Sequence, residues 1–156
     1  MFSDDPIVIT GMGAVSPLGV GVDVNWSRLI AAKSGIVANT RFDTEAYGCK
    51  VAGLVPAKTD DPDGFDPLDF IEAKELKKMD LFIQYSLGAT DEALRQAGWM
   101  PEDEAAQSRT GVVIATGVGG FPAITDAVKT VEARGPRRLS PFTVPSFLPN
   151  LAAGHV

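Results

Sequence analysis

Apolar and polar residues are distributed along the chain in patterns typical of alternating strands and helices. Residues 7–10 (Ile-Val-Ile-Thr) and 110–116 (Thr-Gly-Val-Val-Ile-Ala-Thr) are β-branched apolar runs followed by glycine, and they predict strands buried on both faces. Residues 49–55 predict a third strand, nearer the edge of a sheet. This alternation favours an α/β fold with a parallel sheet. Such sheets usually have about 4–6 strands, so the sheet is expected to be incomplete.

Four segments carry apolar residues every three or four positions, which is the spacing of a helix with one buried face. The most regular of them runs from Met79 to Ala97 and is followed by Gly98, a typical helix-ending residue. Residues 56–72 are rich in aspartate and proline, and this composition indicates a solvated loop. The other helices are expected to begin at Asp23, Pro122 and near Ser146, with stops at Gly35 and Gly135 for the first two and a continuation to Val156 for the last.

The composition indicates one globular domain in the cytoplasm. The chain has 156 residues, of which 45% are hydrophobic and 22% are charged. Its net charge of −6 (14 minus 20) makes nucleic acid an unfavourable partner. One Cys and one His exclude a disulfide framework and metal sites rich in these residues, and no cofactor is expected. No apolar run approaches the roughly 18 residues of a membrane span, and the N-terminal residues do not resemble a secretory signal.

Two glycine-rich turns are candidates for binding chemistry. Gly11 to Ser16 stands where a dinucleotide fingerprint would follow a strand, but Ser16 replaces the third glycine and Pro17 follows at once. A tight turn that brings backbone close to another element is the favoured interpretation. Gly117 to Gly120 could hold an anion on free N–H groups, yet packing beneath another element or lining a narrow pocket is favoured here as well.

The remaining candidates are a lone thiol, a lone imidazole and two basic clusters. Cys49 is interpreted as a small buried side chain, and a catalytic pair with His155 is left open without a feature to support it. The cations at Lys74, Lys77 and Lys78, and at Arg137 and Arg138, are either solvated or form a docking patch for an acidic partner. No motif supplies a nucleophile, a base and an oxyanion hole together.

Several stretches together resemble the N-terminal part of bacterial beta-ketoacyl-acyl carrier protein synthases, closest to class II. The resemblance runs in order along nearly the whole chain, and the set of segments is specific although no single one is decisive. The resembling segments are 7–19, 33–36, 41–44, 51–55, 78–85, 117–120, 141–150 and 153–155.

The resemblance implies a thiolase-like α/β fold, which in the full-length family is an α/β/α/β/α sandwich that works as a homodimer. Residues 1–156 would then be an incomplete N-terminal domain of it. The implied reaction is a decarboxylative condensation in fatty-acid elongation, in which malonyl-acyl carrier protein extends an acyl chain held on an active-site cysteine. The family's catalytic Cys and two His match no residue here, because Cys49 and His155 fall at other positions. The fragment alone is therefore expected to be inactive.

The resemblance also assigns peripheral site residues. Lys74, Lys77 and Lys78, with Arg137 and Arg138, match positions that grip the acyl carrier protein. Gly117, Val118 and Gly119 match a turn that lines the acyl pocket at the dimer interface, and Phe142 and Thr143 match a stretch that the partner subunit contributes. Class II enzymes commonly have an aromatic residue at the position of Thr143, so the preferred acyl length is not implied.

Two alternatives remain at this point. A chain-length-factor-like partner of a polyketide-type condensing heterodimer would keep the fold without elongation chemistry, and the residue at the nucleophile position would distinguish it. A small stand-alone α/β binding domain that uses the glycine-rich turns would need a complete sheet within these residues. The few predicted strands argue against this last possibility.

Overall fold

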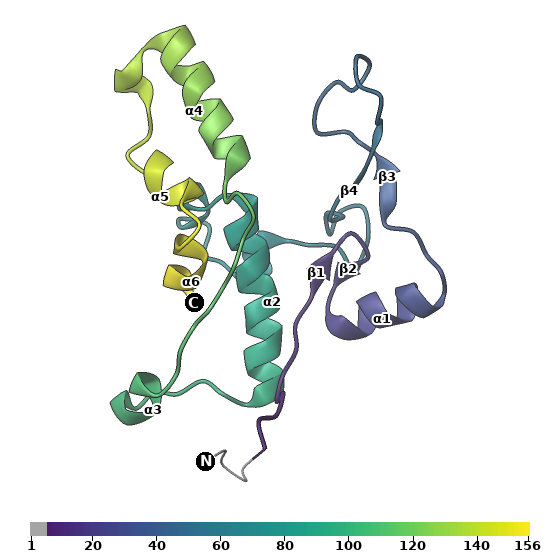
Figure 1. Ribbon diagram of the computed structural model, residues 1–156, viewed down its shortest axis with the longest axis vertical. Coiled ribbons are helices and arrows are strands. Elements are labelled where there is room, and N and C mark those ends of the chain that lie inside the picture. The colour runs from purple at the N-terminus through teal and green to yellow at the C-terminus, as the bar shows by residue number, and fades with distance from the viewer. Residues whose placement is uncertain (1–5) are drawn as a thin grey trace.

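The longest element, helix α2 (Leu81–Ala97), runs through the middle of the molecule in the computed structural model, which describes residues 6–156 (Figure 1). Asp80 caps its first turn, and Gly98 ends it in the left-handed conformation at φ 62°. The helix predicted from the spacing of apolar residues is therefore confirmed. The other helices are α1 (Val22–Ile30), α3 (Glu104–Ser108), α4 (Phe121–Arg134), α5 (Thr143–Phe147) and α6 (Leu151–His155), with 3-10 turns η1 (Pro67–Asp69), η2 (Leu76–Lys78) and η3 (Pro136–Arg138).

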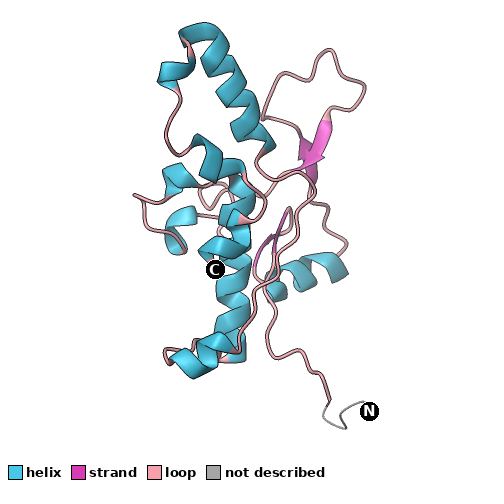
Figure 2. Ribbon diagram, turned by 60° about the vertical axis from the view of Figure 1, so that its left-hand side comes forward, coloured by secondary structure: helices cyan, strands magenta, loops and turns pink. Residues whose placement is uncertain are grey.

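The strands form two antiparallel hairpins. Strand β1 (Val15–Ser16) pairs with β2 (Gly19–Val20), and β3 (Ile36–Ala38) pairs with β4 (Val51–Gly53). Strand β4 confirms the strand predicted within residues 49–55. Parallel pairing in residues 6–156 is limited to one isolated bridge between Ala57 and Phe65, so the parallel sheet predicted from the alternation is not formed there. Figure 2 shows the strands and α1 on one side of α2, and the other helices on the opposite side.

The two strands predicted for residues 7–10 and 110–116 are wrong for this structure. Both segments run as irregular extended connections, and neither is assigned a strand neighbour within the described part of the chain. Their side chains are largely exposed, with Val113 at 95% and Ile9 at 82%. A β-branched run specifies a strand only where a second strand satisfies its N–H and C=O groups.

The connection after residues 7–10 packs against α2 instead of against a strand. The N–H groups of Met12 and Ala14 donate to the side chains of Gln96 and Glu92, at 2.6 and 2.9 Å. A Cβ at Gly13 would overlap the carbonyl oxygen of Ala89, so only glycine permits this approach. This confirms the interpretation of the first glycine-rich turn as a place where backbone passes close to another element.

A small apolar cluster lies where α2, the residues around η2, and α6 meet. Its buried members are Ile71, Met79, Ile83 and Ala152, and Ile83 is fully buried at 0% exposure. The chain exposes 11144 Å² of surface, whereas a compact monomer of this mass would expose roughly 7,500 Å². Much apolar surface is therefore uncovered in the chain by itself.

Two further helix predictions need correction, and one is confirmed. Helix α4 confirms the helix expected from Pro122, which is its second residue. Helix α1 begins at Val22 after Gly21 (φ 98°), so Asp23 is not its cap. The last predicted helix is two short helices, because Pro149 holds Leu148 in an extended conformation and breaks the segment between α5 and α6. Among residues 6–156, no helix has both the length and the apolar character needed to cross a membrane.

Candidate functional site

A basic groove lies beside α4, between η2 and the η3–α5 segment, with a volume of about 280 Å³. It brings together two basic clusters that are far apart in the sequence. Lys77 comes from η2, and Arg138 comes from η3. The other main lining residues are Asp126, Thr130 and Arg134 of α4, with Phe142, Thr143 and Ser146 of the α5 segment.

The turn after α4 places the arginines of this groove. Helix α4 ends at Gly135, whose φ of 82° lets the chain reverse direction, and Pro136 then opens η3. The Arg138 N–H donates to the Gly135 carbonyl at 3.1 Å and holds this turn. Helix α5 then packs back along α4. Arg134 and Arg138 therefore line the same groove.

The lysines of η2 lie over an aromatic ring. The Nζ atoms of Lys77 and Lys78 are 5.3 and 5.6 Å from the centroid of the Phe142 ring. At these distances an ammonium group is attracted by the negative face of the ring. Lys78 also forms an ion pair with Glu75 at 2.6 Å, and the Lys78 hydrogen bond lowers the pKa of Glu75. The ring thus connects η2 to the start of α5.

The groove is positively charged although the chain as a whole is acidic. Within residues 6–156, no carboxylate forms an ion pair with Lys77, Arg137 or Arg138, while Lys74 pairs with Glu72. Of the five basic residues predicted for carrier-protein docking, Lys77 and Arg138 line the groove and Lys78 lies over its aromatic ring. Lys74 and Arg137 are exposed outside the groove lining.

The second glycine-rich turn packs against α5. A Cβ at Gly119, whose φ is 76°, would lie 2.6 Å from the Phe147 carbonyl oxygen, and the Gly120 N–H donates to that oxygen at 3.1 Å. The Gly119 N–H donates to Thr116 Oγ1 at 3.2 Å. These two N–H groups are already paired and are not free for an anion, and the contacts of Gly119 and Gly120 with Phe147 confirm the preferred interpretation of packing against another element.

The residues predicted for an acyl pocket lie at opposite ends of α5. Phe142 and Thr143 belong to the basic groove at the start of the helix. Gly119 contacts Phe147 and Pro149 at the other end, and Val118 exposes its side chain. The residues are thus close in the fold but do not line one cavity in the described part of the chain.

The structure does not bring together the Cys49 thiol and the His155 imidazole, the pair left open in the sequence analysis. Cys49 is exposed in the β3–β4 connection, so its interpretation as a buried side chain is wrong: the strand begins only at Val51. His155 ends α6, and its buried Nε2 has no hydrogen-bond partner among the described residues. The α6 helix and the β3–β4 hairpin lie on opposite sides of α2 (Figure 1). The structure therefore gives no support to a Cys49–His155 pair.

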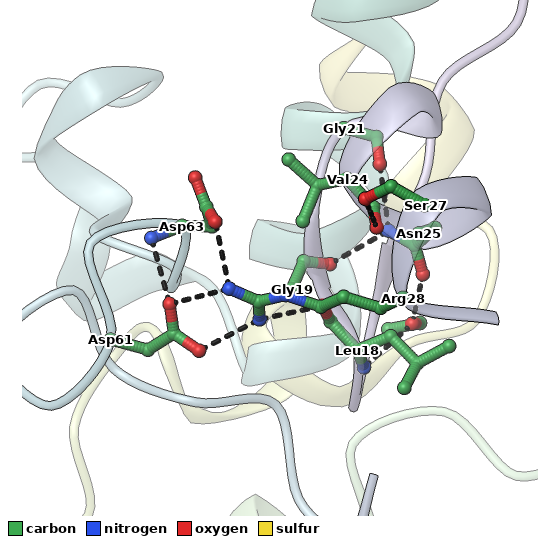
Figure 3. Close-up of polar contacts among 10 residues, drawn as sticks. Leu18, Gly19, Gly21, Val24, Asn25, Ser27, Arg28, Asp61 and Asp63 are labelled. Atoms are coloured by element: carbon green, nitrogen blue, oxygen red, sulfur yellow. Dashed lines mark hydrogen bonds and ion pairs between the residues drawn. The ribbon is translucent and has the colours of Figure 1, made fainter. Parts of the chain in front are cut away.

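Sequence reasoning missed that Arg28 orders the acidic loop that follows β4 (residues 56–72). Its guanidinium donates two hydrogen bonds to Asp61, at 2.7 and 2.8 Å, and one to Asp63 at 2.7 Å (Figure 3). It also donates to the Leu18 carbonyl at 2.9 Å. Residues 56–72 are thus anchored at Asp61 and Asp63 and are not simply solvated. The only signal in the sequence was the opposite charge of a helix arginine and a distant acidic loop. Spacing along the chain does not show that these two segments meet.

The arginine also sets the protonation of its partner. Its hydrogen bond to Asp61 lowers the pKa of that carboxyl group and raises the pKa of the guanidinium. Arg28 and Asp61 line a hollow of about 690 Å³ beside β3 and β4, together with Lys33. Because Arg28 is already paired with two carboxylates, its charge is used to hold the loop and not to attract a ligand.

Comparison with known proteins places these residues in one family. The family described as "Beta-ketoacyl synthase, N-terminal domain" matches residues 4–156. The "3-oxoacyl-(acyl-carrier-protein) synthase 2" of Rhizobium meliloti is 45% identical over 150 residues, covering 96% of this chain and 36% of that protein. The protein of the same name from Staphylococcus aureus N315 is 39% identical over 156 residues, covering 100% of this chain and 36% of that protein.

The solved structures agree on the fold. The structure titled "The ishigamide ketosynthase/chain length factor" is 27% identical with a TM-score of 0.72, and the match covers 93% of this chain and 34% of that one. The prediction of a thiolase-like α/β fold is therefore confirmed. The chain spans 36% of the length of the two curated relatives named above.

Proposed function

The chain belongs to the beta-ketoacyl synthase family, and we propose that it forms the carrier-protein docking face of a condensing acyltransferase of fatty-acid elongation. In this reaction an acyl chain is held as a thioester on the enzyme. Malonyl-acyl carrier protein loses CO₂, and the carbanion left behind attacks the thioester carbonyl and releases the enzyme thiolate. The product is 3-oxoacyl-acyl carrier protein, two carbons longer. The proposal includes a homodimer in the cytoplasm, and no residue described here is assigned to the chemical step.

The observation that carries the proposal is the basic groove on an acidic chain. Lys77, Arg134 and Arg138 line one small volume with a single carboxylate, that of Asp126, whereas the net charge of the chain is −6. A local excess of positive charge attracts an acidic partner and orients it during encounter. The names of the curated relatives include an acyl carrier protein, and an acidic carrier protein suits this groove.

The proposed roles differ among the predicted residues. Lys77 and Arg138 would contact the carrier protein, and Lys78 would do so from above the Phe142 ring. Lys74 and Arg137 lie at the periphery, where they would act through long-range attraction that salt screens. Residues 117–119, with Phe142 and Thr143, are proposed to border the acyl pocket, whose other walls would come from further parts of the dimer.

The docking proposal is tested by reversing charges inside and outside the groove. In the complete protein, Lys77→Glu combined with Arg138→Glu is expected to lower carrier-protein affinity by roughly tenfold or more, because attraction becomes repulsion. Lys129→Glu is the matched control, since this exposed lysine lies on α4 but outside the groove lining. Equal affinities of the charge-reversed and control proteins in a direct binding measurement would sink the docking assignment.

The acyl-pocket assignment is tested at Val118, whose side chain is exposed within the 117–120 turn. Val118→Phe is expected to shorten the longest acyl chain accepted, because the larger side chain fills the pocket. Val118→Ala is the converse variant and should leave longer chains accepted. Product lengths identical among the parent and both variants would contradict the assignment.

A second candidate is a non-elongating subunit of a condensing heterodimer. The observation that favours it is the 27% identity to the structure titled as a ketosynthase and chain length factor. Condensation of malonyl-carrier protein by the purified complete protein alone decides between the two. Product formation supports the elongating enzyme, and its absence together with activity on adding a second subunit supports this alternative.

A further inference from the structure

One residue, Asp80, joins three helices, two through its carboxylate and one through its backbone N–H. Its Oδ1 accepts a hydrogen bond from the Leu81 N–H at the first residue of α2, at 2.5 Å. Its Oδ2 accepts one from the Ala123 N–H in the first turn of α4, at 3.0 Å and 43 residues away in the sequence. The Asp80 N–H in turn donates to the Ser146 carbonyl of α5 at 3.2 Å. A single half-buried residue thus fixes how these helices meet.

Helix α4 has no side-chain cap of its own. Its cap residue is Gly120, and its first turn contains no acidic residue. The first N–H groups of a helix need an acceptor, and its N-terminus carries partial positive charge. Asp80 supplies both the acceptor and the negative charge from a different part of the chain. The same carboxylate does this for α2, so two helix N-termini share one cap.

The glycine turn before α4 is shaped to admit this carboxylate. A Cβ at Gly120 would lie 2.9 Å from Asp80 Oδ2 and 2.7 Å from the Phe147 Cα. Gly120 is therefore required by the approach of the carboxylate and of α5. This accounts for the last glycine of the 117–120 turn without any bound anion.

Asp80 stands between two parts of the proposed site. The lysines of η2, at positions 77 and 78, are close before it in the sequence, and the 117–120 turn leads directly into the helix that it caps. Ser146, which accepts its N–H, also lines the basic groove. Any shift of Asp80 would change the distance between the groove and the turn.

We propose that Asp80 is a positioning residue that sets the 117–120 turn of the acyl pocket against the docking lysines by capping α2 and α4 with one carboxylate. This inference rests on the proposed function for the roles of the groove and the turn. The capping geometry itself does not depend on it. Asp80 touches no reacting group, so it acts through the placement of α4.

The decisive variant is Asp80→Asn. Asparagine caps a single helix about as well as aspartate, but its amide has one acceptor oxygen and presents N–H donors on the other side. It can therefore satisfy one helix N-terminus and not both. Asp103→Asn is the matched control, because Asp103 caps only α3, through the Ala106 N–H at 2.8 Å.

The experiment measures condensation kinetics of the complete protein with acyl and malonyl carrier proteins. For Asp80→Asn we expect kcat to fall roughly tenfold, as for one lost charged hydrogen bond, with the KM for carrier protein within about twofold of the parent. Asp103→Asn should match the parent in both constants. A loss of folding in Asp80→Asn would lower the amount of active enzyme in that variant, which active-site titration and circular dichroism would reveal.

Two results would overturn the inference. One is a kcat of Asp80→Asn equal to that of Asp103→Asn. The other is a raised KM for carrier protein with unchanged kcat, which would place Asp80 in docking alone. Hydrogen exchange of residues 117–125 separates this inference from the proposed function. If the parent protein neither binds carrier protein nor condenses, faster exchange in Asp80→Asn alone still supports the shared cap, and unchanged exchange removes it.

Discussion

The two sides of α2 are held by different kinds of interaction. On one side, Ile71, Met79, Ile83 and Ala152 form a small apolar cluster where α2 and α6 meet. On the other side, the acidic loop is tied to α1 and to the β1–β2 turn by the hydrogen bonds of Arg28 (Figure 3). Apolar burial depends on area and not on direction, whereas a guanidinium fixes its partners by geometry.

This difference explains why each side looks as it does. The cluster is compatible with irregular connecting segments, because apolar packing depends on side-chain volume and contact and not on the direction of a bond. The Arg28 side leaves the apolar face of α1 exposed at Trp26, Leu29 and Ile30 while the polar contacts still define the loop. Around α1, polar groups that are paired in one geometry therefore define the structure even though the apolar face of the helix is uncovered.

The largest expected effect comes from removing volume in the cluster. Ile83→Ala should lower the free energy of unfolding by about 2–5 kcal/mol, because the fully buried side chain would leave a cavity. Val113→Ala truncates a side chain that is 95% exposed and should change the free energy of unfolding by less than about 0.5 kcal/mol. Denaturant unfolding of both variants measures this, and similar losses would refute the cluster as the stabilising centre.

The second largest effect on stability is expected where the backbone at Gly13 packs against α2. Gly13→Ala should cost about 1–3 kcal/mol, since the added methyl group would overlap the Ala89 carbonyl and push the segment away. A Cβ at Gly111 meets no atom within 4 Å, so Gly111→Ala serves as the control. A melting temperature for Gly13→Ala as high as that of the control would mean that the contact between Gly13 and α2 accommodates a methyl group without cost.

A smaller effect is expected on the polar side. Arg28→Lys keeps the positive charge but loses the paired hydrogen bonds to Asp61, so the acidic loop should exchange its amide hydrogens faster. The effect on global unfolding should be smaller than that of Ile83→Ala. Arg95→Lys changes an exposed pair with Asp91 within α2 and should leave the loop unaffected. Loop exchange that is equally slow in both variants would contradict the role of Arg28.

The smallest effect is a dependence on pH. The pKa of Asp61 is lowered in the folded chain by Arg28, so its contribution to stability is present above its unfolded pKa of about 3.9. That contribution is lost as the pH falls through the lower folded pKa, while Arg28 stays protonated. Exchange in the acidic loop should therefore rise below about pH 4 in the parent. In Asp61→Asn this rise should be absent, and its persistence there would exclude the pair as its cause.

The local sequence pattern was sufficient to predict elements whose backbone hydrogen bonds are internal. The helices α2 and α4 were predicted because their hydrogen bonds are internal and their ends are marked by Gly98 and by Pro122. Strand β4 lies within the strand predicted at residues 49–55 near the edge of a sheet, but its partner β3 in an antiparallel hairpin was not predicted. The strands expected at residues 7–10 and 110–116 failed because a strand needs a neighbour, and no periodicity along the chain supplies one.

The candidate site was predictable only in part. The basic residues could be identified from the sequence as two clusters of positive charge, and the family resemblance implied a role for them in carrier-protein docking. Their meeting in one groove depends on the reversal at Gly135 and on the ring of Phe142, which the sequence places far from Lys77. The double cap at Asp80 was not foreseen, because only α2 directly follows it, whereas its contact in α4 lies 43 residues further along the chain.

The sequence by itself determined the family and the helical periodicity of α2 and α4. It marked the glycine-rich turns, but the tertiary structure decided that Gly13 and Gly120 leave no room for a Cβ. The tertiary structure decided which distant groups share a charge or a hydrogen bond: Arg28 with Asp61, Lys77 with Phe142, and Asp80 with α4. The physical reason is range. Helical hydrogen bonds and backbone conformation act over a few residues, whereas ion pairs and shared caps depend on distances in space that only the folded chain sets.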